Sequence, residues 1–269
     1  MDSDARAAAA AMWDGADYDR LAARLAPAAD TVVARLGGDL AGPVIDLAAG
    51  TGSVATRLAQ AGHQVHALDI APGLVARGRA QTKELGLDVR WRVGSMDELD
   101  QADGSYAAVT SSFGLIFALD PVATLSGIAR VLRPDGVLVA AVWEPSGYMA
   151  SMSQAMATRY PAEQRGPATA WIRWGESSQR AAWLDQAGLT ETHVEQHGLP
   201  WEFSSADAAT EFLFTASPGH VAALRAAGPD SGALRRLVRD HLVDFAGLAS
   251  PDRPVSIAAT YQVVTARHA

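Results

Sequence analysis

The stretch "VIDLAAGTGSVA", residues 44–55, combines the three features that decide the fold. An apolar run ends beside Asp46, the chain then turns through Gly50 and Gly52, and a helical pattern begins at Ser53. Glycine adopts the backbone conformations of a tight turn and has no Cβ to block a ligand, while the free amides at a helix N-terminus bind polar groups. The stretch therefore predicts a buried strand, a ligand-binding turn and a helix.

A regular alternation of strand and helix patterns continues from this stretch to residue 143. We expect strands at 43–48, 64–70, 88–94, 105–113 and 137–143, helices at 53–62, 72–86 and 121–132, and a tight turn at "RPDG", 133–136. Such an alternation requires right-handed crossovers and builds a parallel, doubly wound sheet. Ligands of these sheets bind at the carboxyl ends of the strands.

The alternation loosens in the second half of the chain. A helix is expected at 177–187 and two last strands at 192–203 and 256–267, with helical patterning between those strands that includes 233–248. We therefore predict one α/β domain, 1–269, with a doubly wound, seven-stranded, mainly parallel sheet of the Rossmann-like type. Its expected parts are an N-terminal helical lid at 1–40, a cofactor-binding core at 41–144, substrate cap insertions at 145–176 and 204–250, and the remaining helix and strands of the sheet at 177–203 and 251–269.

The composition narrows the possible partners. A net charge of −8 argues against nucleic acid and anionic membranes as partners, so a small molecule is expected. The absence of cysteine excludes disulfides, thiolate nucleophiles and cysteine-based zinc sites, and we expect no metal. The acidic start lacks the pattern of a secretory signal and no stretch is apolar enough to span a membrane, so a cytoplasmic location is expected.

Two kinds of adenosine-containing ligand fit the glycine turn. The spacing Gly50-x-Gly52-x-x-Ala55 matches the dinucleotide fingerprint, and Asp69, nineteen residues after Gly50, fits a carboxylate that holds ribose hydroxyls with either ligand. In a dinucleotide site the amides face a pyrophosphate, and the carboxylate of Asp46 beside it would be poorly placed. S-adenosylmethionine has no phosphate and carries a sulfonium and an ammonium group, so acidic surroundings favour it.

Longer stretches resemble a known family. Residues 44–52 and "VHALDIAPGLVARGRA", 65–80, resemble the first two motifs of class I S-adenosylmethionine-dependent methyltransferases. "FGLIFALDP", 113–121, and "IARVLRPDGVLVAAVWEP", 128–145, resemble later stretches of the branch that includes the ubiquinone- and menaquinone-biosynthesis enzymes and many bacterial small-molecule methyltransferases. The resemblance implies methyl transfer from S-adenosylmethionine to a small-molecule acceptor, which we expect to be a specialised metabolite of secondary metabolism.

The resemblance also assigns cofactor contacts by position. It places Ala48, Gly50 and Gly52 at the methionine part with Asp46 beside them, Asp69 at the ribose, Ile70, Ser95 and Met96 at the adenine, the backbone oxygen of Ser111 at the ammonium group, and Trp13 and Tyr18 on an N-terminal helix that folds over the cofactor. The chain departs from the family at Ala48, where glycine is frequent, and at Ser95, where an aspartate often binds the adenine amino group. A serine accepts that hydrogen bond without a charge, so weaker adenine recognition is expected.

Methyl transfer is an in-line displacement that depends on alignment and on the exclusion of water, and some acceptors also need a general base. The catalytic candidates are His220 in the expected cap, Glu144 at the end of the fifth strand and Tyr148 four residues later. Trp171 and Trp174 are candidates to stack on a flat acceptor. The sequence leaves oxygen, nitrogen and carbon open as the acceptor atom.

Two other functions remain open from the sequence. A cyclase or a binding module that holds S-adenosylmethionine without methyl transfer would have the same cofactor site. A nicotinamide-dependent oxidoreductase would use the same glycine spacing but would lack a Tyr-x-x-x-Lys pair, because Lys83 is the sole lysine and Arg79 stands four residues before it.

Overall fold

A computed structural model describes residues 3–14, 17–37, 40–159 and 170–269. Its strands are β1 Val44–Leu47, β2 Val65–Asp69, β3 Val89–Val93, β4 Tyr106–Ser112, β5 Leu132–Trp143, β6 Leu189–Phe203 and β7 Val255–His268. They form one seven-stranded sheet in the order β3-β2-β1-β4-β5-β7-β6, in which β7 runs antiparallel to both of its neighbours and the other pairs are parallel. The predicted fold class is confirmed.

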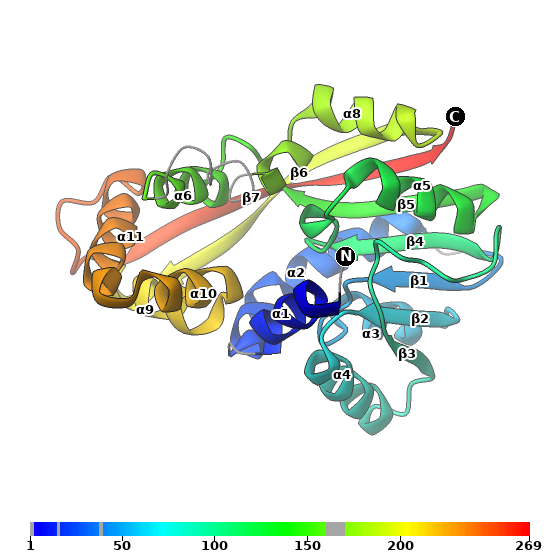
Figure 1. The fold of residues 1–269 in the computed structure, drawn as a ribbon, viewed down its shortest axis with the longest axis horizontal. Helices are drawn as coiled ribbons and strands as arrows, with labels where there is room; N and C mark the ends of the chain where they lie inside the picture. The colour runs from blue at the N-terminus through cyan, green and yellow to red at the C-terminus, as the bar shows by residue number, and fades with distance from the viewer. Residues whose placement is uncertain (1–2, 15–16, 38–39, 160–169) are drawn as a thin grey trace.

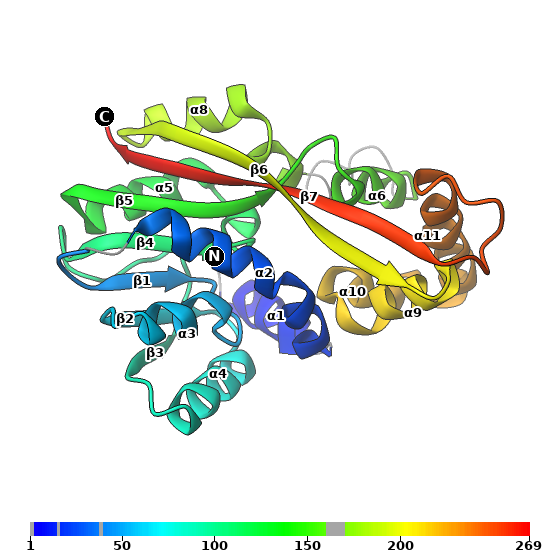
Figure 2. The same cartoon turned by 180° about the vertical axis from the view of Figure 1, so that it is seen from behind.

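Helices cover both faces of this sheet. They are α1 Ser3–Asp14, α2 Tyr18–Leu36, α3 Ser53–Gln60, α4 Pro72–Glu84, α5 Pro121–Val131, α6 Tyr148–Ala157, α8 Ser177–Gln186, α9 Ala206–Ala216, α10 Pro218–Ala227 and α11 Ser231–Phe245, with short 3₁₀ helices η1 Leu115–Phe117, η2 Ala170–Trp174 and η3 Gly228–Asp230. The views from the two sides show α5 and α8 on one face and α2 and α3 on the other (Figures 1 and 2). In the described part of the chain, no helix is long and apolar enough to cross a membrane.

The last two strands of the sheet are longer than their neighbours, and this length positions the cap. The pairing of β5 with β7 ends at Trp143 and Tyr261, whereas β6 and β7 continue to pair with each other until Phe203 meets Val255. This two-stranded extension projects beyond the core and carries α9, α10 and α11, with α6 alongside (Figure 1). The helical cap expected between the last two strands is therefore held on a β-ribbon.

The N-terminal helices differ from the expected lid at 1–40. Helix α2 buries Leu21, Ala28, Ala29 and Val32 and packs against α3 and the sheet, so it belongs to the body of the domain. Helix α1 instead contacts α4 and α10, and it is the part that lies between the core and the cap. The apolar face of α2 explains the difference, because a helix with a continuous buried stripe packs on a core.

The predicted tight turn at 133–136 lies inside β5. Tyr106 pairs with Leu132 and Ala108 pairs with Val137, so the strand accommodates the extra residues as an irregularity in its ladder with β4. The Arg133 guanidinium donates a hydrogen bond to the carbonyl of Ala41, which ties this irregularity to the start of β1. Residues 133–136 thus form a bulge within β5 and not a turn between two separate elements.

Candidate active site

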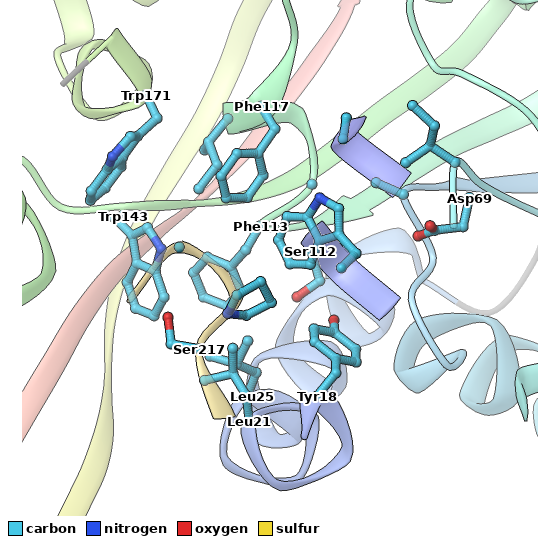
Figure 3. Close-up of a pocket in the computed structure, with 18 of the residues that line it drawn as sticks. Tyr18, Leu21, Leu25, Asp69, Ser112, Phe113, Phe117, Trp143, Trp171 and Ser217 are labelled. Atoms are coloured by element: carbon cyan, nitrogen blue, oxygen red, sulfur yellow. The ribbon is translucent and has the colours of Figure 1, made fainter. Parts of the chain in front are cut away.

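A cavity of about 390 Å³ opens at the carboxyl ends of β1 to β5, between the core, α1 and the cap. Figure 3 shows Asp69 at one end of it and Trp143, Trp171 and Ser217 at the other. The cavity therefore joins the glycine turn of the core to the helices of the cap, which is the position that doubly wound sheets use for ligands.

The turn after β1 contains three residues with positive backbone φ angles. Gly50 has a φ of 59° and Gly52 a φ of 96°, and Ala48 also takes a positive φ of 51°. A Cβ at Gly50 would stand 2.7 Å from the Tyr18 hydroxyl, so glycine is required there both for its φ and for the close approach of α2. Ala48 lines the cavity, whereas Gly50 and Gly52 shape the turn behind it.

Asp69 is joined to this turn by hydrogen bonds. One carboxylate oxygen accepts from the Gly50 amide at 2.7 Å, and the other accepts from the Ala71 amide at 2.9 Å. The side chain is 5% exposed yet lines the cavity, and burial raises its pKa above the ordinary range. The expected ribose-binding carboxylate thus stands at the cavity wall in a fixed orientation.

Asp46 lies below the cavity floor. Its carboxylate accepts a hydrogen bond from the Thr110 hydroxyl at 2.9 Å, and burial raises its pKa to about 7, with the nearby Asp69 acting in the same direction. A small recess beside the main cavity is lined by Asp46 together with Tyr18 and Ser112. A cation bound there would favour the ionised carboxylate.

At the expected adenine end the cavity is also lined by Asp97, a carboxylate that was not predicted from the sequence. Ile70, Ser95 and Met96 line the cavity, and Asp97 lines it next to them. The Ser95 hydroxyl donates to Asp97 Oδ2 at 3.3 Å, while Asp97 Oδ1 accepts from the Thr124 hydroxyl at 2.6 Å. The signal was available in the sequence, since Asp97 follows the end of β3 by four residues and lies in the same loop as Ser95.

Ser112, rather than Ser111, lines the cavity. The Ser111 hydroxyl is fully buried, donates to the Leu47 carbonyl at 2.8 Å and accepts from the Leu115 amide at 3.1 Å. Two serines in succession at the end of a strand point to opposite sides, and the sequence alone did not distinguish them.

Trp13 and Tyr18 close the cavity from the N-terminal helices. The Trp13 ring packs edge-on against Tyr18, with centroids 5.9 Å apart, and against Phe117 at 4.9 Å. All three line the cavity. Phe117 belongs to η1, so aromatic contacts join α1 to the core across the cavity mouth.

The cap end of the cavity is aromatic and rich in methionine. Phe113 has a positive φ of 59° and stacks on Trp143 with centroids 4.0 Å apart and planes at 20°. Trp171 lines the same end, while Trp174 is buried away from it against Trp183. Further lining side chains missed by the sequence analysis come from one face of α6: Met149, Met152 and Met156. Their i, i+3, i+7 spacing was the available signal.

His220 is the catalytic candidate that the structure brings to the cavity. It lines the cap end, is 7% exposed, and its Nδ1 lies 2.9 Å from the Ser217 hydroxyl. Its Nε2 is buried with no hydrogen-bond partner among the described residues, and burial lowers its pKa to about 4. The imidazole is therefore neutral at pH 7.

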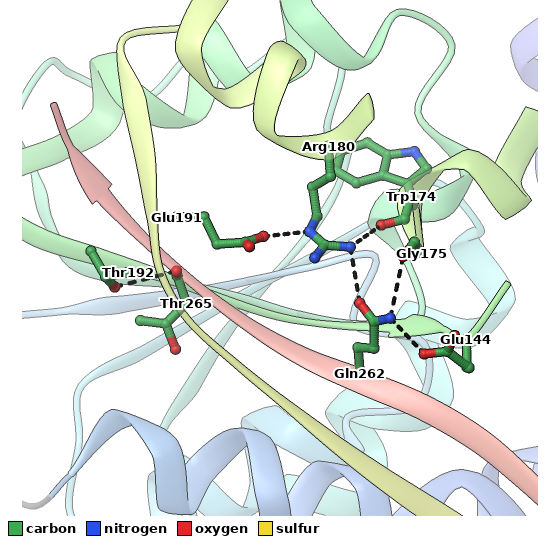
Figure 4. Close-up of polar contacts among 8 residues, drawn as sticks. All are labelled: Glu144, Trp174, Gly175, Arg180, Glu191, Thr192, Gln262 and Thr265. Carbon is green, nitrogen blue, oxygen red and sulfur yellow. Dashed lines mark hydrogen bonds and ion pairs between the residues drawn. The ribbon is translucent and has the colours of Figure 1, made fainter. Parts of the chain in front are cut away.

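The other two catalytic candidates, Glu144 and Tyr148, lie outside the described lining of the cavity. Glu144 accepts from Gln262 Nε2 at 2.5 Å, and Gln262 Oε1 accepts from Arg180, which also pairs with Glu191 (Figure 4). Tyr148 is 1% exposed and packs against other cap side chains. Glu144 is thus part of a polar network that fixes the segment after β5, and Tyr148 is part of the packing between α6 and α11.

Comparison with known proteins agrees with this geometry. Residues 44–136 match the family described as "methyltransferase domain". A Mycobacterium tuberculosis protein described as uncharacterized is 32% identical over 185 residues, 68% of this chain and 65% of that protein. A demethylmenaquinone methyltransferase from a Mycobacterium species is 38% identical over 157 residues, 54% of this chain and 63% of that protein. The chain thus spans just under two thirds of these relatives.

The fold is also found in solved structures. The YcgJ protein of Bacillus subtilis superposes with a TM-score of 0.62 at 16% identity, over 90% of this chain and 98% of that one. The sheet and the glycine turn define a Rossmann-like methyltransferase fold, and residues 44–136 are the part of it that matches the methyltransferase-domain family. The resemblance to class I S-adenosylmethionine-dependent methyltransferases is confirmed, and with it S-adenosylmethionine as the cofactor.

Proposed function

We propose that this protein transfers a methyl group from S-adenosylmethionine to a small-molecule acceptor held under the helical cap. The observation that carries the proposal is the single cavity that joins Asp69 at one end to the aromatic cap end, where Trp143 and Trp171 stand. A cofactor at the turn and an acceptor at the cap would meet inside this cavity, away from bulk water.

The cofactor-binding roles follow from position. Ala48 and the turn through Gly50 and Gly52 form the surface for the methionine part, with Asp46 below it as the carboxylate that favours a positive charge. Asp69 has two oxygens for the ribose hydroxyls. We propose that Ile70, Ser95 and Met96 contact the adenine. The backbone of Ser111 and its neighbour Ser112 would contact the ammonium group. Trp13 and Tyr18 would cover the cofactor.

The chain's own contribution to the reaction is alignment and the exclusion of water. S-adenosylmethionine supplies the reactive methyl group when it is bound. The edge-on contact of Trp13 with Phe117 covers the cavity between α1 and η1, and the stacked pair of Phe113 and Trp143 limits the space in which an acceptor can lie. Fixing two reactants in line in a dry site is the main source of acceleration for such a displacement.

We propose a specialised metabolite as the acceptor and the cytoplasm as the place of reaction. The name of one relative, demethylmenaquinone methyltransferase, adds quinols to the acceptors that should be tested. The net charge of −8 disfavours nucleic acid as the methylated partner.

Labelled methyl donor tests the proposal. The protein is incubated with S-adenosylmethionine labelled in the methyl group and with the small-molecule fraction of a bacterial extract or a quinol. We expect label in an extractable product, little product with Asp69→Asn, and full product with Asp185→Asn, which changes an exposed carboxylate on α8. Tight binding of S-adenosylhomocysteine without labelled product from any acceptor would instead identify a cyclase or a binding module.

A further inference from the structure

We infer that the acceptor is an uncharged, flat aromatic compound with a hydroxyl group, and that His220, oriented by Ser217, receives the hydroxyl proton as the methyl group is transferred to oxygen. This inference rests on the proposed methyl transfer and adds to it the class of acceptor and the residue that handles the proton.

The charges around the cavity indicate an uncharged acceptor. Among the described residues that line it, the charged side chains are Asp69 and Asp97, and both stand at the cofactor end. No lysine or arginine is found in this described lining. A carboxylate or phosphate enclosed there would lose its hydration without gaining a cation as partner, which is strongly unfavourable.

The cap end favours a flat aromatic ring. Trp143 and Trp171 line it together with Phe113, whose ring stacks on that of Trp143. Aromatic side chains bind flat rings by stacked or edge-on contact. The three methionines on α6 line the cavity as well, and thioether side chains adapt to rings of different outline and make favourable contacts with them.

The polar group of the acceptor is indicated by His220. A buried imidazole nitrogen without a hydrogen-bond partner is costly, so Nε2 of His220 should find its partner in the ligand. The Ser217 hydroxyl lies 2.9 Å from Nδ1, and when it accepts the Nδ1 proton it leaves the Nε2 lone pair free. A neutral imidazole in this tautomer accepts a hydrogen bond from an acceptor hydroxyl and cannot pair with a carboxylate.

The proton balance supports a hydroxyl acceptor. A lone pair on the acceptor oxygen forms the new bond to the methyl carbon while the carbon–sulfur bond breaks and its electron pair stays on sulfur. The hydroxyl proton passes to His220 Nε2, giving a methyl ether, S-adenosylhomocysteine and an imidazolium that returns its proton to solvent. The lowered pKa of His220 is sufficient, because the oxygen becomes a strong acid as its bond to the methyl carbon forms.

Naphthols and naphthoates test the inference. 1-Naphthol, 2-naphthol and the corresponding naphthoates are each incubated with labelled S-adenosylmethionine, and the products are identified by mass spectrometry and NMR. We expect methyl ethers from at least one naphthol, with kcat/KM at least tenfold above that of the matching naphthoate. His220→Gln and His220→Asn should lower kcat by about 10²- to 10⁴-fold, with naphthol KM and the Kd of S-adenosylhomocysteine nearly unchanged. Ser217→Ala should lower kcat less.

The cap contains a matched control. His241 also pairs with a serine, its Nε2 lying 2.8 Å from the Ser151 hydroxyl, but it does not line the cavity. His241→Gln should therefore change kcat less than twofold.

Several results would overturn the inference. One is turnover of the naphthoates as efficient as that of the naphthols, and another is a product with the methyl group on a ring carbon. The others are an undiminished kcat in both His220 variants, or no methylation of either naphthol by protein that binds S-adenosylhomocysteine. Failure of the wild-type protein to bind S-adenosylhomocysteine would instead refute the proposed function itself.

Discussion

The carboxylate of Asp69 accepts a 2.7 Å hydrogen bond from the backbone amide of Gly50, which joins the end of β2 to the turn after β1. The same turn is contacted from α2, since the Tyr18 hydroxyl occupies the space that a Cβ on Gly50 would need. Three segments that are separate in sequence therefore meet at one glycine, and the shape of the cofactor end depends on it.

Gly50→Ala should impair cofactor binding far more than a comparable substitution elsewhere. Its φ is 59°, where alanine costs about 1–2 kcal/mol, and the new Cβ would also displace the Tyr18 hydroxyl. Gly86, with a φ of 69° and open space around it, is the matched control. Denaturant unfolding should show a loss of stability in both variants, larger in Gly50→Ala because of the added contact with Tyr18, and calorimetry should show at least tenfold weaker S-adenosylhomocysteine binding in Gly50→Ala alone. Equal affinities of the two variants would refute this role for the turn.

Affinity for S-adenosylmethionine should rise with pH because of Asp46. Burial raises its pKa to about 7, so the carboxyl is largely protonated at pH 6 in the free protein, and a cationic ligand favours the ionised form. Binding then releases a proton, and affinity should increase about tenfold between pH 6 and pH 8, levelling above pH 7. The test is the difference between wild type and Asp46→Asn, which cancels any titration of the ligand. Parallel pH profiles of the two proteins would show that Asp46 does not titrate with binding.

Arg180→Leu should destabilise the fold. The guanidinium is 2% exposed and binds Glu191, the Trp174 carbonyl and Gln262, so its removal leaves buried acceptors without a partner. We expect a loss of about 3 kcal/mol in the free energy of unfolding, measured by urea denaturation. Arg92→Leu removes the exposed pair with Asp100 and should change stability little. Similar midpoints for both variants would show that the network is not a structural anchor.

Local patterns were sufficient to predict the doubly wound sheet. The spacing of apolar residues and the turn residues predicted the strands and helices of the core. Gly50 and Asp69 could be assigned to one site because the carboxyl ends of parallel strands meet at one edge of the sheet. The "RPDG" segment at 133–136 was predicted as a turn between elements, because its bulge depends on the ladder with β4. Turn residues alone do not distinguish a turn that ends a strand from a bulge within one.

The acceptor end was less predictable, since its residues are brought together by long-range contacts. Glu144 stands at a strand end, as an acceptor contact would, but its partner Gln262 lies 118 residues away and turns it from the cavity. Ser112 and Asp97 each lie beside a residue that was named, and only the side-chain directions in the folded chain distinguish them. His220 was identified by residue type, whereas its pairing with Ser217 became visible in the structure.

Calorimetric titration with S-adenosylhomocysteine and with NADH shows whether the glycine turn holds S-adenosylmethionine or a dinucleotide. We expect micromolar or tighter binding of S-adenosylhomocysteine and no measurable binding of NADH. Asp69→Asn should lower the affinity for S-adenosylhomocysteine about ten- to hundredfold through weaker hydrogen bonds to the ribose. Asp185→Asn should bind like wild type. Tight binding of NADH with no binding of S-adenosylhomocysteine would show that the turn holds a dinucleotide.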